Sequence, residues 1–140
     1  MLPAANGQSI LSRLLTFGLP TVAAINGHAF AGGFLLSLAC DHRVMRTERG
    51  FLCMNEIDIG FALTPGMNAL LDAKLPKHVM RDTVLQGRRW TAEEAVAQGF
   101  VDAVEAVEGL PAAAAAVAAS HAPKGANSAL VGARKTQDDA

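Results

Sequence analysis

Apolar residues in this chain come in short clusters separated by glycine, proline or polar residues. Residues 10–17 carry apolar side chains at helical spacing and precede Pro20, which predicts the end of an amphipathic helix. Residues 21–25 are apolar, with three β-branched side chains, and predict a strand buried on both faces, as in parallel sheets. The pair Gly32-Gly33 opens a Leu-rich run to Cys40, which predicts a buried helix that begins at the glycines.

The middle of the chain alternates further short elements with turns. Residues 41–45 are a second strand candidate, and residues 47–50 form a polar turn. Residues 51–54 resume apolar character, and the segment from Glu56 to Gly60 leads into a loop. We therefore expect strand, helix and strand in succession, which favours an α/β domain.

Helix signals dominate the second half. Pro65 fits a first-turn proline, and a second helix follows Pro76 and ends at Gly87. Thr91 and Glu94 have the spacing of a capping box. The remaining predicted elements are an extended segment at 100–104, an alanine-rich helix at 110–120 and a last helix from about Lys124. We expect an α/β core over residues 1–104 and a helical region over residues 105–140.

Composition narrows the classes of function. The chain has 140 residues with 12 basic and 13 acidic side chains, and this balance argues against a nucleic-acid partner. It has no apolar run of membrane-spanning length, and its start lacks the order of a signal peptide. Cys40 and Cys53 form no metal or redox motif, so we expect two reduced cysteines in an intracellular protein.

Several spaced motifs together carry a family resemblance. They are PTVAAINGHAFAGGFLLSLACD from Pro20, FLCMNEIDIG from Phe51, the Thr64-Pro65-Gly66 segment and TAEEAVAQGFVDAV from Thr91. The chain resembles the crotonase, or enoyl-CoA hydratase/isomerase, superfamily over roughly residues 11–104. The resemblance implies a crotonase-like core of repeated ββα units, with C-terminal helices that support trimer contacts in the complete protein.

The glycine cluster suits the binding of a negative charge. Gly32 and Gly33 lack Cβ atoms, and their amides lie where a helix begins, so a developing anion can approach them closely. The resemblance implies that the Gly32 amide is one of two donors that hold a thioester oxygen. From the local pattern alone, tight helix–strand packing explains the glycines equally well.

Glu56 is the candidate base. It lies between apolar segments, where partial desolvation would raise its pKa, although a solvated loop acid or helix cap is the simpler interpretation of the pattern alone. The resemblance places Glu56 at the position of the family's catalytic glutamate. Hydratases of the family carry a second glutamate where this chain has Leu35. A single carboxylate suffices to move a proton from C2 to C4, so the sequence favours double-bond migration over hydration.

The resemblance also implies the ligand and its surroundings. The substrate is an acyl-CoA, with no metal and no further cofactor, and residues predicted to line the acyl channel are Phe30, Ala31, Gly33, Leu35, Thr64, Pro65 and Gly66. His28 precedes the glycines and is a structural or solvated histidine, with ligand contact as the alternative.

The predicted activity is that of an enoyl-CoA isomerase. Alternatives are a hydratase or another acyl-CoA reaction of the family, a binding module without chemistry, and an inactive truncated paralogue. The last arises because the family's FSAGxD-like segment, which supplies the other oxyanion donor, does not occur in the sequence. We therefore expect a fragment. Its compartment is expected to be the peroxisome or the cytoplasm, with no targeting signal visible.

Overall fold

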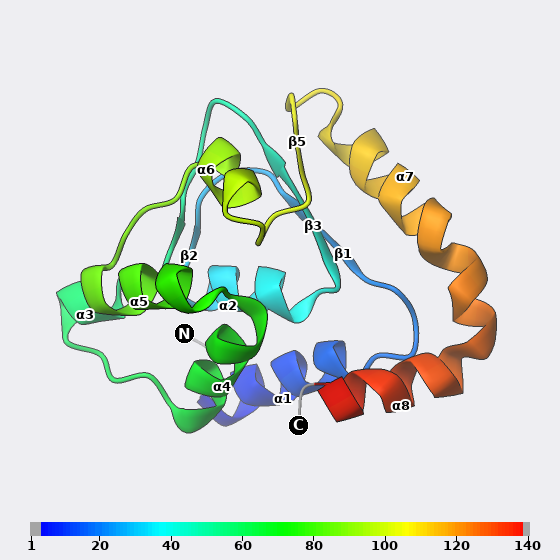
Figure 1. Cartoon of the computed structure of the whole chain (residues 1–140), viewed down its shortest axis with the longest axis horizontal. Coiled ribbons are helices and arrows are strands. Elements are labelled where there is room, and N and C mark those ends of the chain that lie inside the picture. The colour runs from blue at the N-terminus through cyan, green and yellow to red at the C-terminus, as the bar shows by residue number, and fades with distance from the viewer. Residues whose placement is uncertain (1–3, 139–140) are drawn as a thin grey trace.

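The computed structural model describes residues 4–138, and its elements alternate as expected for an α/β domain (Figure 1). In chain order they are α1 (Ala4–Leu15), β1 (Val22–Ile25), β2 (Ala29–Phe30), α2 (Gly32–Ala39), β3 (His42–Arg46), β4 (Leu52–Cys53), α3 (Glu56–Ile59), α4 (Pro65–Lys74), α5 (Lys77–Gln86), α6 (Ala92–Ala97), β5 (Ala103–Glu105), α7 (Leu110–His121), the 3₁₀ helix η1 (Ala122–Asn127) and α8 (Ser128–Asp138).

The strands form two small parallel sheets. In the first sheet the order is β1-β3-β5, with Val22 opposite His42 and Val44 opposite Ala103. In the second sheet β2 pairs with β4, and Phe30 lies opposite Cys53. Parallel pairing confirms the expectation drawn from the apolar strand at residues 21–25.

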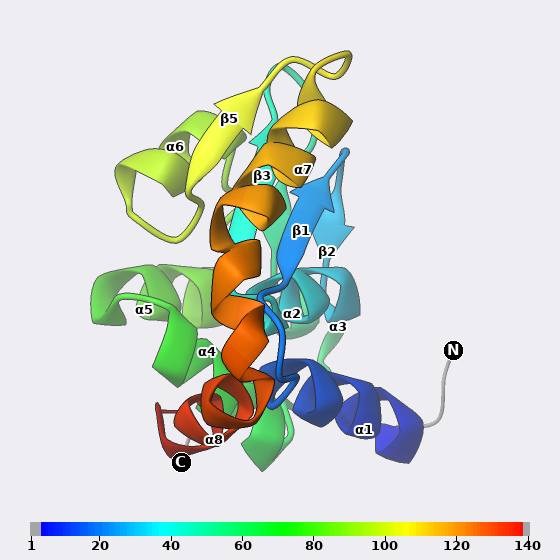
Figure 2. The same cartoon turned by 90° about the vertical axis from the view of Figure 1, so that its right-hand side faces the viewer.

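The burial of β1 differs from the prediction. Of its four residues only Ile25 is buried, and Ala24 is exposed. The reason is the position of the strand at the edge of the described sheet, with β3 on one side only. Helix α7 lies across one face of this sheet and contacts both β1 and β3 (Figure 2). Complete burial is found instead in the central strand, where Val44 and Met45 are fully covered.

Helix α2 forms the middle of the hydrophobic core. Phe34, Leu35 and Leu38 are buried on its inner side, whereas Leu36 is exposed on the outer side. Helix α4 packs against α2, and Leu71 and other apolar side chains of α4 and α5 extend the core. The buried helix predicted from the glycines is therefore confirmed.

Local signals at the helix ends are confirmed. Pro65 occupies the first turn of α4, and Gly87 ends α5 in the left-handed conformation, with φ of 60°. The Thr91 hydroxyl accepts from the Glu94 amide, and the Glu94 carboxylate accepts from the Thr91 amide.

Two predicted boundaries are shifted. Strand β5 begins late, because Phe100 and Val101 pack into the core before it. The last α-helix begins at Ser128, because Lys124 lies in the 3₁₀ helix η1.

Two charged side chains tie the elements together. The buried Arg43 guanidinium donates to the carbonyls of Ser37, Cys40 and Phe100, and so holds the C-terminal end of α2. The Asp41 carboxylate accepts from the amide and hydroxyl of Thr21 and from Lys135 of α8. Although burial raises the pKa of Asp41, these hydrogen bonds outweigh it and leave the pKa below its usual value.

A close approach of two glycines brings the second sheet together. A Cβ atom added to Gly50 would lie 2.4 Å from the Gly27 carbonyl carbon, and Gly50 has φ of 102°. Just beyond this contact, the Ala29 amide donates to the Phe51 carbonyl. Because this approach excludes a side chain, Gly50 fixes where β2 lies beside β4.

Candidate active site

Two strand-to-helix junctions lie side by side at one edge of the second sheet. Strands β2 and β4 run parallel, so their carboxyl ends meet at the same edge. The Ala31 amide, just after β2, donates to the Cys53 carbonyl of β4 at 2.8 Å. Beyond this hydrogen bond, the segment after β2 enters α2 at Gly32, and the segment after β4 enters α3 at Glu56. The topology therefore brings the predicted amide and the predicted carboxylate to one edge.

The junction between β2 and α2 exposes backbone. Ala31 has φ of 51° and ψ of −117°, a backbone conformation that residues other than glycine rarely adopt. Its carbonyl accepts a hydrogen bond from the Leu35 amide. A Cβ atom added to Gly32 would meet no heavy atom within 4 Å. Open space next to a helix start leaves room for an anionic group at the first amides of α2.

The junction between β4 and α3 carries the acid. Glu56 is the first residue of a one-turn helix that ends at Gly60, rather than part of a loop. Its side chain is 7% exposed, and among the described residues its Oε2 atom has no hydrogen-bond partner. Burial raises the pKa of Glu56 above its usual 4.5, against a smaller lowering by its own backbone amide. A desolvated carboxylate is a stronger base than a solvated one.

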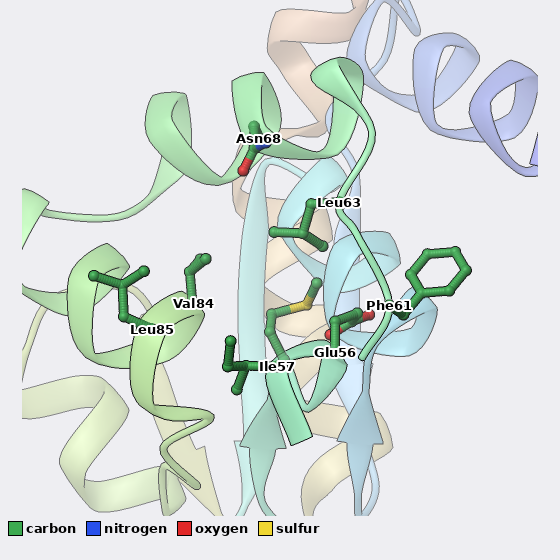
Figure 3. Close-up of a pocket in the computed structure, with 8 residues that line it drawn as sticks. Glu56, Ile57, Phe61, Leu63, Asn68, Val84 and Leu85 are labelled. Atoms are coloured by element: carbon green, nitrogen blue, oxygen red, sulfur yellow. The ribbon is translucent and has the colours of Figure 1, made fainter. Parts of the chain in front are cut away.

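The Glu56 carboxylate borders an apolar hollow of about 250 Å³ (Figure 3). Its walls come from Met54 before α3, from α3 and the segment that follows it, and from α4 and α5. We call this space the acid hollow; it is lined by Met54, Glu56, Ile57, Phe61, Leu63, Asn68, Val84 and Leu85. In Figure 3 the side chains of Leu63 and Asn68 reach toward the space from one side, and Ile57 and Val84 reach toward it from the others.

A second hollow, of about 330 Å³, runs along β1 and the outer side of α2. It is lined mostly by small residues and backbone, and includes Gly33, Leu36 and His28. His28 is exposed, its Nδ1 accepts from the Phe51 amide, and its ring packs edge-on against Phe30. The two glycines of the predicted cluster therefore have different surroundings, because Gly33 lines this hollow and Gly32 faces open space.

None of the other residues predicted to contact the acyl chain lies on a described wall of the acid hollow. Leu35 is 1% exposed and belongs to the core beneath α2. Thr64 caps α4 by accepting from the Met67 amide, with Pro65 and Gly66 in the exposed first turn. Neither hollow has Phe30, Ala31 or these residues on its wall. Their contact with a ligand stays a prediction.

Several lining residues are absent from the sequence prediction. Leu63 and Asn68 flank the Thr64-Pro65-Gly66 segment, and Val84 and Leu85 come from α5. Leu85 is a strongly exposed apolar residue at the end of α5, but this exposure is visible only in the folded structure. Asn68 has no signal in the pattern either.

Within residues 4–138 no group of three His, Cys, Asp or Glu side chains is arranged to hold a metal ion. Cys40 and Cys53 are both free thiols, as expected, and burial raises the pKa of each. No helix in the described part of the chain is long and apolar enough to cross a membrane.

The comparison with protein families agrees with the fold. The model of the enoyl-CoA hydratase/isomerase family matches residues 2–136. The chain therefore belongs to the enoyl-CoA hydratase/isomerase family, as the motifs predict.

The curated relatives include proteins named as enoyl-CoA delta isomerases and proteins named as carnitinyl-CoA dehydratases. Enoyl-CoA delta isomerase 3 and the peroxisomal enoyl-CoA delta isomerase 2, both of Arabidopsis thaliana, are 42% and 41% identical over 96 residues, which are 68% of this chain. Carnitinyl-CoA dehydratase of Salmonella arizonae is 38% identical over 98 residues, 70% of this chain. The chain spans about 40% of the length of these relatives.

Solved structures agree on the crotonase-like fold. An enoyl-CoA hydratase/isomerase family protein of Pseudomonas syringae superposes with a TM-score of 0.87 at 29% identity, over 96% of this chain and 60% of that one. A probable enoyl-CoA hydratase of Mycobacterium tuberculosis gives a TM-score of 0.84 at 26% identity, over 94% of this chain and 55% of that one.

Proposed function

We propose that this chain carries the proton-transfer half of an enoyl-CoA isomerase site, with a 3-enoyl-CoA as substrate and a 2-enoyl-CoA as product. The observation that carries the proposal is the surroundings of Glu56. It is a buried carboxylate with a raised pKa, and it is the only ionisable side chain among the described residues on the wall of the acid hollow. The 42% and 41% identity to two delta isomerases supports the same choice.

The reaction needs one base and one donor to the thioester oxygen. Glu56 takes the proton from C2, and the electrons of that C–H bond form a dienolate whose oxygen accepts a hydrogen bond from the Gly32 amide. Glu56 then returns the same proton to C4, the double bond moves to C2–C3, and the carboxylate is regenerated. Stabilisation of such an oxyanion by one donor is typically worth about 10²–10³ in rate.

The side chain at Leu35 supports migration of the double bond over addition of water. Leu35 is buried in the core, so α2 offers no second carboxylate at that position to hold a water molecule. Water is then poorly activated near the dienolate, and proton return to C4 is favoured. The proposed reaction uses no metal or redox group, and CoA enters only as part of the substrate.

The direct test is an isomerase assay of the purified chain. Conversion of a 3-enoyl-CoA produces a conjugated thioester, which is followed by its absorbance. Glu56→Gln should lower kcat/KM by about 10²–10⁴, the usual contribution of a general base, with the fold unchanged. Asp58→Asn is the matched control, because it removes an exposed carboxylate of the same short helix and should retain activity.

A second candidate is hydration or dehydration, which is favoured by the 38% identity to a carnitinyl-CoA dehydratase. The same assay with a 2-enoyl-CoA distinguishes it. Formation of a 3-hydroxyacyl-CoA, abolished by Glu56→Gln, would replace the isomerase proposal with a hydratase. A folded chain that turns over neither substrate would be the inactive paralogue, and tight binding of acyl-CoA without turnover would favour a binding module.

A further inference from the structure

Asn68 is the second polar side chain on the wall of the acid hollow. Apart from Glu56 and Asn68, this wall is built from Met, Ile, Phe, Leu and Val side chains. The Asn68 side chain extends from α4 toward the hollow in Figure 3. A carboxamide on an apolar wall is unusual, because an alkyl chain that covered it would leave its donors and acceptor without partners.

The backbone of α4 does not need this side chain. The Thr64 hydroxyl accepts from the Met67 amide, and the Asn68 amide donates to the Thr64 carbonyl, so the first turn is already capped. Among the described residues no protein group hydrogen-bonds to the Asn68 carboxamide, which is exposed to solvent. Asparagine is also a poor helix former. Neither helix capping nor core packing therefore explains the residue.

The acid hollow has a defined capacity. At roughly 30 Å³ for each water-sized group, about 250 Å³ holds about eight chain atoms. If C2 and C4 of a substrate lie at Glu56, its next carbon atoms have room in the hollow that Leu63 and Val84 also line. An oxygen substituent on these carbons would come within the part of the hollow that Asn68 borders.

We infer that Asn68 is a specificity-determining residue, which selects acyl-CoA substrates with a hydroxyl or oxo group on the chain beyond the reacting carbons. A carboxamide both donates and accepts, so it pairs with either oxygen group. An unsubstituted chain leaves the carboxamide unpaired and is bound less well. This inference rests on the proposed function, because it takes Glu56 as the place where the chain reacts.

The test compares two substrates of equal length, 3-octenoyl-CoA and 8-hydroxy-3-octenoyl-CoA. The original chain should have about tenfold higher kcat/KM for the hydroxylated substrate, the value of one net hydrogen bond. Asn68→Leu should reverse this preference by removing the polar partner and adding apolar surface. Gln86→Leu is the matched control, since it removes an exposed carboxamide that does not line the acid hollow and should keep the original preference.

The outcomes separate this inference from the proposed function. Turnover of both substrates with an unchanged ratio in Asn68→Leu would overturn the role of Asn68 and leave the isomerase intact. If neither substrate is turned over, the proposed function fails, and the inference is then tested by binding. Calorimetry of Glu56→Gln with octanoyl-CoA and 8-hydroxyoctanoyl-CoA should still show the preference, and equal affinity in that experiment would overturn the inference.

Discussion

The two junctions at the edge of the second sheet contribute different chemistry from the same architecture. Both follow a short parallel strand and open a helix. The junction before α2 offers backbone at Gly32 with open space around it, and the junction before α3 offers the buried carboxylate of Glu56. A parallel strand pair thus brings the proposed anion-binding amide and the proposed base to the same edge of one small sheet.

The largest expected effect comes from separating the two junctions. Gly50→Ala places a Cβ atom against the backbone of Gly27 and forces a side chain into a left-handed conformation, so it should destabilise the fold by about 2–4 kcal/mol. Urea denaturation measures this loss. The matched control is Gly60→Ala, which has a positive φ but no atom within 4 Å of the added Cβ, and should cost only about 1 kcal/mol. Equal losses in the two variants would show that the glycine contact does not hold β2 beside β4.

The next effect concerns turnover and comes from a change at the junction between β2 and α2 alone. Gly32→Ala adds a methyl group to the open space where the thioester oxygen would lie, so kcat/KM should fall at least about tenfold while folding stability is retained. Gly7→Ala in α1 adds a methyl group that also meets no atom within 4 Å, and it should leave turnover unchanged. Full activity in Gly32→Ala would place the thioester elsewhere.

The burial of Glu56, at the junction between β4 and α3, should appear in the pH dependence of folding stability. Because the folded state raises the pKa of Glu56 above 4.5, the folded state binds the proton more tightly than the unfolded state does. Stability from this residue is therefore complete below pH 4.5 and is lost as the pH rises through the raised pKa. Glu56→Gln, which cannot ionise, should be more stable than the original chain at neutral pH, and the difference should shrink on acidification. Denaturation at several pH values measures it, and a constant difference would contradict the desolvation of Glu56.

The smallest effect concerns strain before α2. Ala31→Gly should stabilise the fold by about 1 kcal/mol, because relief of the unfavourable φ of 51° exceeds the entropy that glycine costs. An ordinary helix position such as Ala115 in α7 should instead lose about 1 kcal/mol on the same change. Chemical denaturation of both variants provides the comparison. Loss of stability in both would show that Ala31 carries no strain.

Local signals allowed much of the fold to be predicted. Some signals act within a few residues, so their effect can be predicted without knowledge of the tertiary structure. They are the glycine pair, Pro65, Gly87 and the Thr91–Glu94 capping box. The parallel strands followed from continuous apolar runs. The exposure of Ala24 was not predictable, because it depends on which side of β1 another strand occupies.

The candidate site was only partly predictable for the same reason. Glu56 could be placed by family resemblance, but the hollow that it borders is also lined by residues of α4 and α5. Asn68 and Val84 are 12 or more positions further along the chain, and no periodic pattern links them to the acid. Only the packing of three helices around one space brings them together.

Hydrogen exchange at C2 of a bound acyl-CoA tests the central claim most directly. A saturated acyl-CoA such as octanoyl-CoA is incubated with the chain in deuterated water, and mass spectrometry follows deuterium at C2. If Glu56 removes that proton while a helix-start amide stabilises the enolate, the original chain incorporates deuterium and Glu56→Gln falls to the uncatalysed background. Equal incorporation by both proteins would contradict the assignment of Glu56 as the base.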